Sequence, residues 1–594
     1  MSGDITKKGG SFLVEDTEPA VVFTPEDFSE EQKMFAQTAM DFVRNEVIPR
    51  IEETEAQKKG VMVELLKKSG ELGLLMVDIP EKYGGLGMGK ATSMYVSEVI
   101  SRGGSFATTL GVHTGIGSLP VVYFGTEEQK QKYLPRLATA ELMGCYALTE
   151  ANSGSDALAA KTRAELNPDG THYIMNGEKL FVTNGGFSDV FFVFAKINSE
   201  DFSCFIVERG YEGVSIGAEE KKLGIKGSST VTLILDDAKV PAENLLGERG
   251  KGHKIAFNIL NIGRFKLGVG GVGAAKQAFD DAVKYSTERH QFGKAICSFG
   301  MIKNKIANMA SSIYVTESMS YRTAGLMDAR LAAVDKDAAD AAKKTLAGIE
   351  EYAIECSIMK VKGSEMLEKV TYDAIQMLGG YGYMQEYNVE RYWRDARIAS
   401  IYEGTNEINR LVIPGMLIKR AMKGELPLMA AAKQLQSELL EFPALEEEEN
   451  EGLLSAESRV VAKAKKIALL AAGTAVQKYM DKLGDEQGIL GNIADILIEI
   501  YGMESAVLRT LKIAAARGED VAALPAQMTQ LYIYDAMGKI DLWAKEVLAA
   551  SAKGDELRTM LAALRRFTRY ALVDTLRLRL AIADWFIEKE KYEL

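Results

Sequence analysis

Apolar residues recur along the chain at two different spacings, which divide it into helical and extended parts. From residue 25 to about residue 140 the spacing is that of amphipathic helices, with breaks at Gly84-Gly85 and Gly103-Gly104. The first 25 residues are mainly polar, which predicts a loosely ordered start. A helical domain is expected after this start.

The period changes close to Cys145, where short apolar runs replace the helical spacing. These runs are rich in β-branched or aromatic residues and are bounded by Asn, Asp and Gly, as is typical of strands. They cover residues 191–194, 202–207 and 230–235. The pattern predicts an antiparallel sheet between two helical regions.

Long helical periods return between residues 252 and 423, with a clear interruption at Glu403-Gly404. One glycine motif in this region, residues 268–273, matches G-x-G-x-x-G. A dinucleotide-binding loop needs a strand before its glycines, but residues 255–267 show the spacing of a helix. We therefore expect these glycines to form a close helix-packing face.

The composition shifts again after Lys423. Two prolines and the acidic run 446–449 indicate a linker. Beyond it, the spacing predicts about four helices in an appended bundle. The expected breaks between these helices are Gly484, Gly518, Pro525 and Gly554.

We predict a mostly helical α+β fold in five parts. An N-terminal helical domain spans 26–142, and a middle antiparallel β domain spans 143–251. A C-terminal four-helix domain spans 252–423, a linker spans 424–456, and an appended helical bundle spans 457–594. The length of 594 residues fits this division, because chains of this size form several domains of about 150 residues each.

Composition and charge exclude several classes of function. The net charge of −12 disfavours non-specific binding to nucleic acid or anionic lipid, which both need clustered Lys and Arg. The four cysteines form no C-x-x-C pair and the four histidines show no metal spacing, so no disulfide framework and no metal site is predicted. The start lacks an apolar signal segment, and no later run is long enough to span a bilayer. We expect a soluble, cytoplasmic protein.

One carboxylate stands beside a glycine at a predicted loop-to-helix junction, in the segment 397–408. Glu403 precedes Gly404 there, and a glutamate held at such a turn can abstract a proton. The alternative is an acidic residue before an ordinary helix start, with Thr405 or Asn406 as the N-cap. Apolar neighbours would raise the pKa of Glu403, whereas a helix N-terminus would lower it, and the sequence leaves this balance open.

Far upstream, residues 146–156 join an extended apolar run to a turn of small polar residues. Such a segment suits backbone and hydroxyl contacts to a flavin and its pyrophosphate, although it also fits a simple serine-rich turn. Together, the segments 146–156 and 397–408 resemble the signature regions of the acyl-CoA dehydrogenases. The resemblance covers roughly residues 30 to 420, in the order of that family.

The resemblance implies an FAD-dependent enzyme that converts a fatty acyl-CoA to a trans-2-enoyl-CoA in fatty acid β-oxidation. Its electrons would pass to an electron-transfer flavoprotein. Glu403 matches the base of many family members, and Arg264 matches an arginine near the active site. By its chemistry Arg264 can orient the base or a loop through a charge-assisted hydrogen bond, while its residue type alone also fits a surface cation.

The resemblance also assigns the contacts to FAD. Contacts from the same subunit are assigned to Tyr146, Leu148, Thr149, Gly154, Ser155, Phe181, Thr183, Thr405 and Glu407. Contacts across a subunit interface are assigned to Arg289, Phe292, Gln376 and Gly380. The cofactor site would then be completed only in an oligomer. Most relatives carry tryptophan at the position of Phe181. Phenylalanine keeps the ring stacking but lacks the N–H donor of tryptophan. As alternatives, Phe181 fits a buried strand residue, and the segments of Arg289 and Gln376 fit helix ends with basic caps.

The far end of the acyl pocket bears on the length of the substrate. In the family, a segment matching residues 105–113 closes this end. Ala107, Gly111 and Val112 are small and uncharged, which implies space for a longer acyl chain; the alternative is a tightly packed helix pair. Contacts to the substrate are assigned to Gly111, Ser155, Tyr402 and Gly404.

The appended bundle points to the very-long-chain branch of the family, whose members carry a comparable extension in place of a further subunit pair. A homodimer is therefore expected. In those relatives the linker includes a basic amphipathic segment associated with membrane docking, whereas this chain has the acidic run 446–449. Because anionic lipid repels acidic charge, we predict no strong membrane binding.

Two other functions fit the same scaffold. An acyl-CoA oxidase shares the fold and the base but lets oxygen reach the reduced flavin. The second alternative function is a non-catalytic binding or assembly protein, such as a nucleic-acid-binding relative with a basic tail. Residues 457–594 contain 20 Lys and Arg against 19 Asp and Glu, so the tail is nearly neutral and no nucleic-acid partner is expected. The intact Glu403 favours catalysis.

Overall fold

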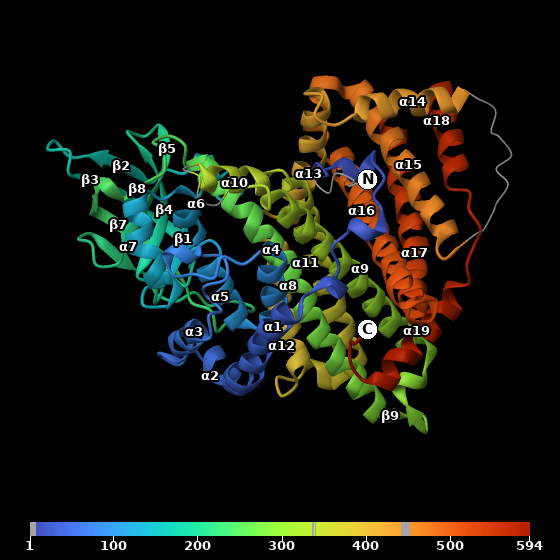
Figure 1. The fold of residues 1–594 in the computed structure, drawn as a ribbon, viewed down its shortest axis with the longest axis horizontal. Helices are drawn as coiled ribbons and strands as arrows, with labels where there is room; N and C mark the ends of the chain where they lie inside the picture. Colours follow the sequence, from blue (N-terminus) through green and yellow to red (C-terminus); the bar gives the residue numbers. More distant parts are fainter. Residues whose placement is uncertain (1–6, 336–337, 339, 441–451) are drawn as a thin grey trace.

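The computed structural model describes residues 7–335, 338, 340–440 and 452–594 (Figure 1). A β domain lies at one end of the molecule, a helical bundle lies at the other, and long helices run between them. The predicted mostly helical α+β fold, with a β domain between helical regions, is confirmed. The acidic run 446–449, on which the prediction about membranes rests, lies outside the described residues.

The N-terminal helices are α1 (Glu30–Phe42), α2 (Ile51–Glu55), α3 (Val61–Glu71), α4 (Lys90–Ile100), α5 (Ser105–Thr114), α6 (Leu119–Phe124) and α7 (Glu127–Ala138). Side chains fix where two of them begin. The Ser29 hydroxyl accepts a hydrogen bond from Gln32 N, and the Thr126 hydroxyl accepts one from Gln129 N, each in a capping box. A predicted break precedes α5 at Gly104, whose φ of 59° is open to glycine at little cost.

The prediction of a loosely ordered start is wrong for residues 7–25. Phe12 and Leu13 are only 4% and 5% exposed and belong to the main hydrophobic core. The main-chain N–H of Gly10 donates to the buried Glu355 carboxylate at 2.7 Å. Scattered apolar residues and main-chain hydrogen bonds dock this polar segment, and they leave little periodic signal in the sequence.

The middle domain is a sheet with strand order β6-β7-β3-β2-β4-β5-β8 and with β1 beside β4. Its strands are β1 (Gly144–Ala147), β2 (Arg163–Leu166), β3 (His172–Thr183), β4 (Val190–Ile197), β5 (Asp201–Glu208), β6 (Val214–Ile216), β7 (Thr230–Pro241) and β8 (Leu245–Leu246). The predicted strands lie within β4, β5 and β7. The antiparallel prediction is wrong for β1 with β4 and for β2 with β4, which pair in parallel because intervening strands carry the chain back between them.

Long helices follow the sheet: α8 (Gly252–Glu288), α9 (Gly300–Leu331), α10 (Ala341–Glu350), α11 (Ala353–Leu378), α12 (Asn388–Ala396) and α13 (Asn406–Met422), with the hairpin of β9 (His290–Gln291) and β10 (Lys294–Ala295) after α8. The glycines of 268–273 lie inside α8, so the predicted helix-packing face is confirmed. A Cβ added to Gly268 would lie 2.4 Å from the Met359 main-chain oxygen of α11, and one on Gly273 would lie 1.7 Å from the Glu98 main-chain oxygen of α4. Glycine alone permits these approaches.

The chain ends in helices α14 (Leu428–Leu440), α15 (Ser455–Tyr479), α16 (Gln487–Arg517), α17 (Glu519–Ser551), α18 (Gly554–Phe567) and α19 (Thr575–Lys589). The expectation of about four helices beyond residue 457 is wrong, since the described residues there form five. Pro525 lies inside α17 instead of ending a helix. The additional break, at residues 568–574, contains no glycine or proline; its one local signal is Asp574, which caps α19.

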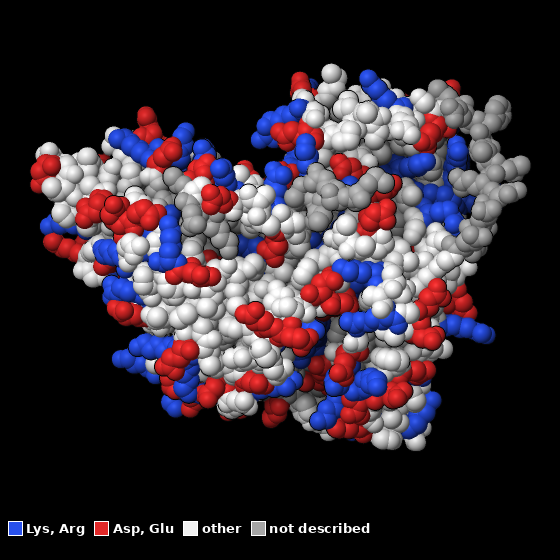
Figure 2. All heavy atoms as spheres, viewed as in Figure 1, with Lys and Arg blue, Asp and Glu red and all other residues white. Residues whose placement is uncertain are grey.

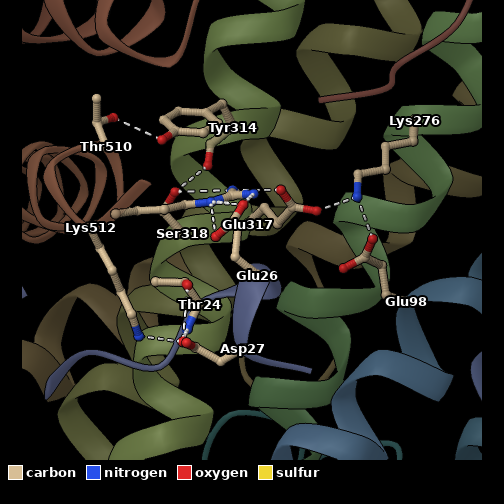
Figure 3. Close-up of polar contacts among 11 residues, drawn as sticks. Thr24, Glu26, Asp27, Glu98, Lys276, Tyr314, Glu317, Ser318, Thr510 and Lys512 are labelled. Atoms are coloured by element: carbon tan, nitrogen blue, oxygen red, sulfur yellow. Dashed lines mark hydrogen bonds and ion pairs between the residues drawn. The ribbon is translucent and has the colours of Figure 1, made fainter. Parts of the chain in front are cut away.

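A buried ionic network joins the N-terminal segment, the central helices and the bundle (Figure 3). Arg509 of α16 pairs with Glu26, which precedes α1, at 2.7 Å and with Glu317 of α9 at 2.6 Å. Lys276 of α8 pairs with Glu317 and, at 2.6 Å, with Glu98 of α4. Burial alone would raise the pKa of Glu317, but the charges of Lys276 and Arg509 lower it to about 2. The bundle is therefore tied electrostatically to the rest of the fold.

The surface carries mixed charge on the face in Figure 2, where Lys and Arg side chains are interspersed with Asp and Glu side chains. Lys and Arg side chains also gather at the upper right of this view, beside the grey residues. In the described ranges, no helix combines the length and the apolar character that crossing a bilayer requires.

Arg509→Met should weaken the docking of the bundle, because it leaves the buried carboxylates of Glu26 and Glu317 without their cation. Removing one partner of such a pair costs about 3–5 kcal/mol, so we expect a clear drop in melting temperature by differential scanning fluorimetry. Arg558→Met is the matched control, because the side chains of Arg558 and its partner Asp555 are 83% and 94% exposed. Equal melting temperatures for the two variants would contradict the role assigned to the network.

Candidate active site

Glu403 lies in a tight turn between the 3₁₀ helix Arg397–Ser400 and α13. Glu403 and Gly404 both have positive φ, 58° and 79°, a conformation that is costly for a non-glycine residue and is concentrated at functional sites. The Thr405 hydroxyl then accepts a hydrogen bond from Ile408 N at 3.2 Å and caps α13. The predicted loop-to-helix junction is confirmed, with Thr405 as its N-cap.

The carboxyl of Glu403 is enclosed by the protein. Its Oε2 atom is buried without a hydrogen-bond partner among the described residues, and a Cβ added to Gly263 of α8 would lie 2.7 Å from that atom. Burial raises the pKa of Glu403 to about 7, although the charges of Arg264 and Lys360 act to lower it. Loss of hydration therefore outweighs the nearby cations and raises the pKa, the direction expected from the apolar neighbours.

Arg264 holds this turn through its main chain. Arg264 Nε donates to the Glu403 carbonyl oxygen at 3.1 Å, and Nη1 donates to Asn261 Oδ1 at 3.2 Å. Asn409 Nδ2 donates to the Gly404 carbonyl oxygen at 2.9 Å from the other side. The guanidinium thus fixes the turn by charge-assisted hydrogen bonding and acts on the carboxyl through its charge.

Glu403 lines a cavity of about 190 Å³ between α4, α5, α8 and α12. Tyr402 and Gly111, both predicted to contact the substrate, line the same cavity, as do Ala107 and Val112 of α5. A Cβ added to Gly111 meets nothing within 4 Å, so this glycine faces open space. Open space at Gly111 does not fit the alternative of a tightly packed helix pair.

The two segments expected to face the flavin meet at the end of β1. Leu180 N of β3 donates to the Thr149 carbonyl oxygen at 2.8 Å. Lys179 Nζ donates to the Leu148 carbonyl oxygen at 3.2 Å and to the Glu150 carboxylate at 2.6 Å, which ties the two segments together. This fully buried lysine was not predicted, although the alternation along β3 places it on the inward face.

The other residues predicted to contact FAD from the same subunit are exposed or half-buried. Phe181 is 62% exposed and has a φ of 57°, and Thr183 beside it is half-buried. Gly154 and Ser155 are exposed in an open turn, and Glu407 is exposed in the first turn of α13. An uncovered aromatic ring near an open polar turn fits the stacking of a planar ring and the binding of a phosphate. These residues therefore fit FAD.

Tyr146 connects this surface with Glu403. The Tyr146 hydroxyl is buried and has no hydrogen-bond partner within the described chain. Burial raises its pKa; the charge of Glu403 raises it further, and the charge of Arg264 opposes the rise. Buried polar atoms without partners are rare in folded proteins and are typical of places where another group binds.

Arg289, Phe292, Gln376 and Gly380 lie on another part of the surface. The Arg289 guanidinium is 5.5 Å from the ring centre of Tyr381, which follows α11. Phe292, at the tip of the β9–β10 hairpin, is 93% exposed. Among the described residues, the lining of the cavity at Glu403 includes none of the four. Of the predicted site residues, Gly111, Tyr402 and Glu403 line the cavity, whereas every residue assigned to FAD lies outside its lining.

Models of successive domains of one protein family match the chain in order. The model described as "Acyl-CoA dehydrogenase, N-terminal domain" matches residues 29–141, the middle-domain model matches 145–238, and a C-terminal-domain model matches 250–417. A further model, also described as "Acyl-CoA dehydrogenase, C-terminal domain", matches 463–566 within the bundle.

Similar proteins agree with these matches. The "Probable acyl-CoA dehydrogenase" of Bacillus subtilis (strain 168) is 51% identical over 586 residues, which are 99% of this chain and 98% of that protein. The "Very long-chain specific acyl-CoA dehydrogenase, mitochondrial" of Homo sapiens is 39% identical over 389 residues, which are 64% of this chain and 55% of that protein. The crystal structure of an acyl-CoA dehydrogenase complexed with FAD from Bacillus anthracis gives a TM-score of 0.97 at 52% identity, covering 99% of this chain and 100% of that one. Likeness of this degree over the full length shows that the chain belongs to the acyl-CoA dehydrogenase family.

Proposed function

We propose that the chain is an FAD-dependent acyl-CoA dehydrogenase that converts a long-chain fatty acyl-CoA to the trans-2-enoyl-CoA in fatty acid β-oxidation. The observation that carries this proposal is the Glu403 carboxyl, whose unpartnered Oε2 atom belongs to a residue on the wall of a cavity. Its pKa of about 7 suits a general base at neutral pH.

Glu403 would take the proton from the carbon next to the thioester. Its carboxylate has an oxygen free to accept that proton, and Arg264 holds the turn that presents it. A bound acyl chain that fills the cavity would displace water from this oxygen. When bound, FAD supplies the acceptor for the hydride from the next carbon, a role that no side chain can fill.

The residues placed to hold FAD support a homodimer. Tyr146, Phe181 and Thr183 would contact the ring from the subunit that carries the cavity. Arg289 and Phe292 lie on a surface apart from that cavity, so we propose that they contact the FAD of a second copy. Covering the exposed ring of Phe292 in a dimer would contribute about 1.5–3 kcal/mol.

The length of the cavity supports a long acyl chain. Its lining follows α8 from Gly263, next to the Glu403 carboxyl, to Gln277. The 14 steps from residue 263 to residue 277, at about 1.5 Å of rise each, span about 21 Å. An extended chain advances about 1.2 Å per bond, as three backbone bonds span about 3.6 Å, so about 17 bonds fit along this path. We further propose electron-transfer flavoprotein as the electron acceptor, on family membership alone; the cytoplasmic location stays a prediction.

Glu403→Gln should leave the binding of FAD and acyl-CoA intact and slow the reduction of the flavin. The amide keeps the size of the carboxyl but cannot take the proton, and a positioned base contributes about 10²-fold to 10⁴-fold. Anaerobic stopped-flow reduction by a long-chain acyl-CoA measures this rate. Asp395→Asn is the matched control, because Asp395 Oδ2 is a second buried carboxyl oxygen without a partner at this cavity. A larger loss in Asp395→Asn than in Glu403→Gln would reassign the base.

Flavin reduction should rise with pH through about 7 and level off above it, because Glu403 must lose its own proton before it can accept another. Below this pKa, kcat/KM should fall about tenfold per pH unit, since it reports the free enzyme. Burial also raises the pKa of Asp395 to about 7, so the profile of Asp395→Asn distinguishes the two carboxyls. The acid limb should persist in Asp395→Asn and disappear from the residual rate of Glu403→Gln; the opposite pattern would count against Glu403.

Gly111→Leu should shorten the preferred acyl chain. Because Gly111 faces open space, a leucine side chain can enter the cavity and occupy the path of the acyl tail. Each methylene that loses its burial lowers kcat/KM by about fourfold, so long acyl-CoAs should suffer while short ones keep their rates. Gly538→Leu, on an exposed face of α17 where an added Cβ also meets nothing within 4 Å, is the control. Equal losses at every chain length in Gly111→Leu would contradict this role.

A further inference from the structure

Polar side chains line the end of the cavity away from Glu403, and carboxylates of α8 outside the lining hold them in place. Gln277 and Tyr392 both line the cavity there. Gln277 Nε2 donates to Asp281 Oδ1 at 3.1 Å, and the Tyr392 hydroxyl donates to Asp281 Oδ2 at 2.9 Å. One carboxylate on α8 thus keeps two lining side chains in place at the end away from Glu403.

Arg102 also lines this end, and its partner is the neighbouring carboxylate on α8. Arg102 Nη1 lies 3.3 Å from Asp280 Oδ2, and the two side chains are only 15% and 21% exposed. The other oxygen, Asp280 Oδ1, accepts a hydrogen bond from the main-chain N–H of Tyr592 at 2.6 Å. Asp280 therefore links the wall of the cavity to the end of the appended bundle, 312 residues further along the chain.

Tyr592 is anchored in the core of the protein. Its ring stacks on Phe586 of α19 at a centroid distance of 5.4 Å and meets Phe279 of α8 edge-on at 5.8 Å. Lys276 Nζ lies 5.3 Å from the centre of the Tyr592 ring, and this lysine also belongs to the ionic network of Arg509 (Figure 3). The contacts that dock the bundle therefore also fix the position of Tyr592.

We propose that Asp280, held by Tyr592, is a positioning residue that keeps Arg102 across the far end of the cavity and so limits the length of the acyl chain. The inference rests on the proposed function, since it takes this cavity as the acyl site. An acyl tail that reaches the wall must displace a paired and mostly buried guanidinium and leave a carboxylate without its partner, which is unfavourable. Without the tether, Arg102 can turn towards solvent and the cavity becomes longer.

The test compares Asp280→Asn and Tyr592→Ala with the wild-type holoenzyme in anaerobic flavin reduction by saturated acyl-CoAs of increasing length. Asp280→Asn keeps the shape of the side chain and removes the charge that holds Arg102. Tyr592→Ala removes the ring that anchors the main-chain donor. In both variants kcat/KM for the longest acyl-CoAs should rise, by up to about fourfold for each methylene that gains burial, while the shorter substrates keep their values.

Glu590→Gln is the control, because it removes one carboxylate charge from the same tail, at a group that accepts a hydrogen bond from Thr287 Oγ1, and leaves Asp280 untouched. FAD content and melting temperature establish that each variant is folded, and Asp280→Asn decides the question if Tyr592→Ala loses FAD. An unchanged chain-length profile in the folded Asp280→Asn holoenzyme would overturn the inference and leave the proposed function intact. A wild-type holoenzyme whose flavin no acyl-CoA reduces would overturn the proposed function itself.

Discussion

Main-chain contact between α8 and α11 fixes the helix that carries groups at both ends of the cavity. A Cβ added to Gly363 of α11 would lie 2.3 Å from the Gly268 oxygen of α8, so neither helix can slide or rotate without a clash. Arg264, which holds the turn of Glu403, and Gln277, at the far end of the cavity, are carried on this one helix. The distance from Glu403 to the far end of the cavity is therefore set by the rigid helix α8, so the fold can limit the length of the acyl chain.

Glu317 and Glu403, which both have buried carboxyl oxygens, differ in charge because their partners differ. Glu317 forms ion pairs with Lys276 and Arg509, and its pKa falls to about 2. Glu403 keeps an oxygen without a partner, and its pKa rises to about 7. Arg264 is near enough to oppose that rise, yet its N–H groups bond to the main chain of the turn and to an amide. A carboxylate in a full ion pair would be a poor base. Because Arg264 bonds to the main chain and leaves the Glu403 oxygen without a partner, the arrangement suits proton removal.

Features with a local signal could be predicted from the sequence, whereas long-range contacts could not. Strands β4, β5 and β7, the glycine face of α8 and the turn at Glu403 all have short, recognisable patterns. The pKa of Glu403 could not be predicted, because the groups around the turn come from α8, with Arg264 139 residues earlier. Lys179 was visible in the alternation of β3 but was missed, since lysine is rarely fully buried. The contact between Asp280 and Tyr592 joins positions 312 residues apart and has no pattern of its own.

The appended bundle completes the core of the central helices. Val269 of α8, Ile313 of α9, Ile496 of α16 and Ile540 of α17 belong to one cluster of buried residues. Separately folded domains usually meet across smaller and more polar interfaces, so a shared apolar core marks the bundle as part of the same folding unit. The ionic network of Arg509 crosses the same boundary and reaches α8. Because α8 in turn carries Arg264, which holds the turn of Glu403, the bundle supports the geometry of the base without touching it.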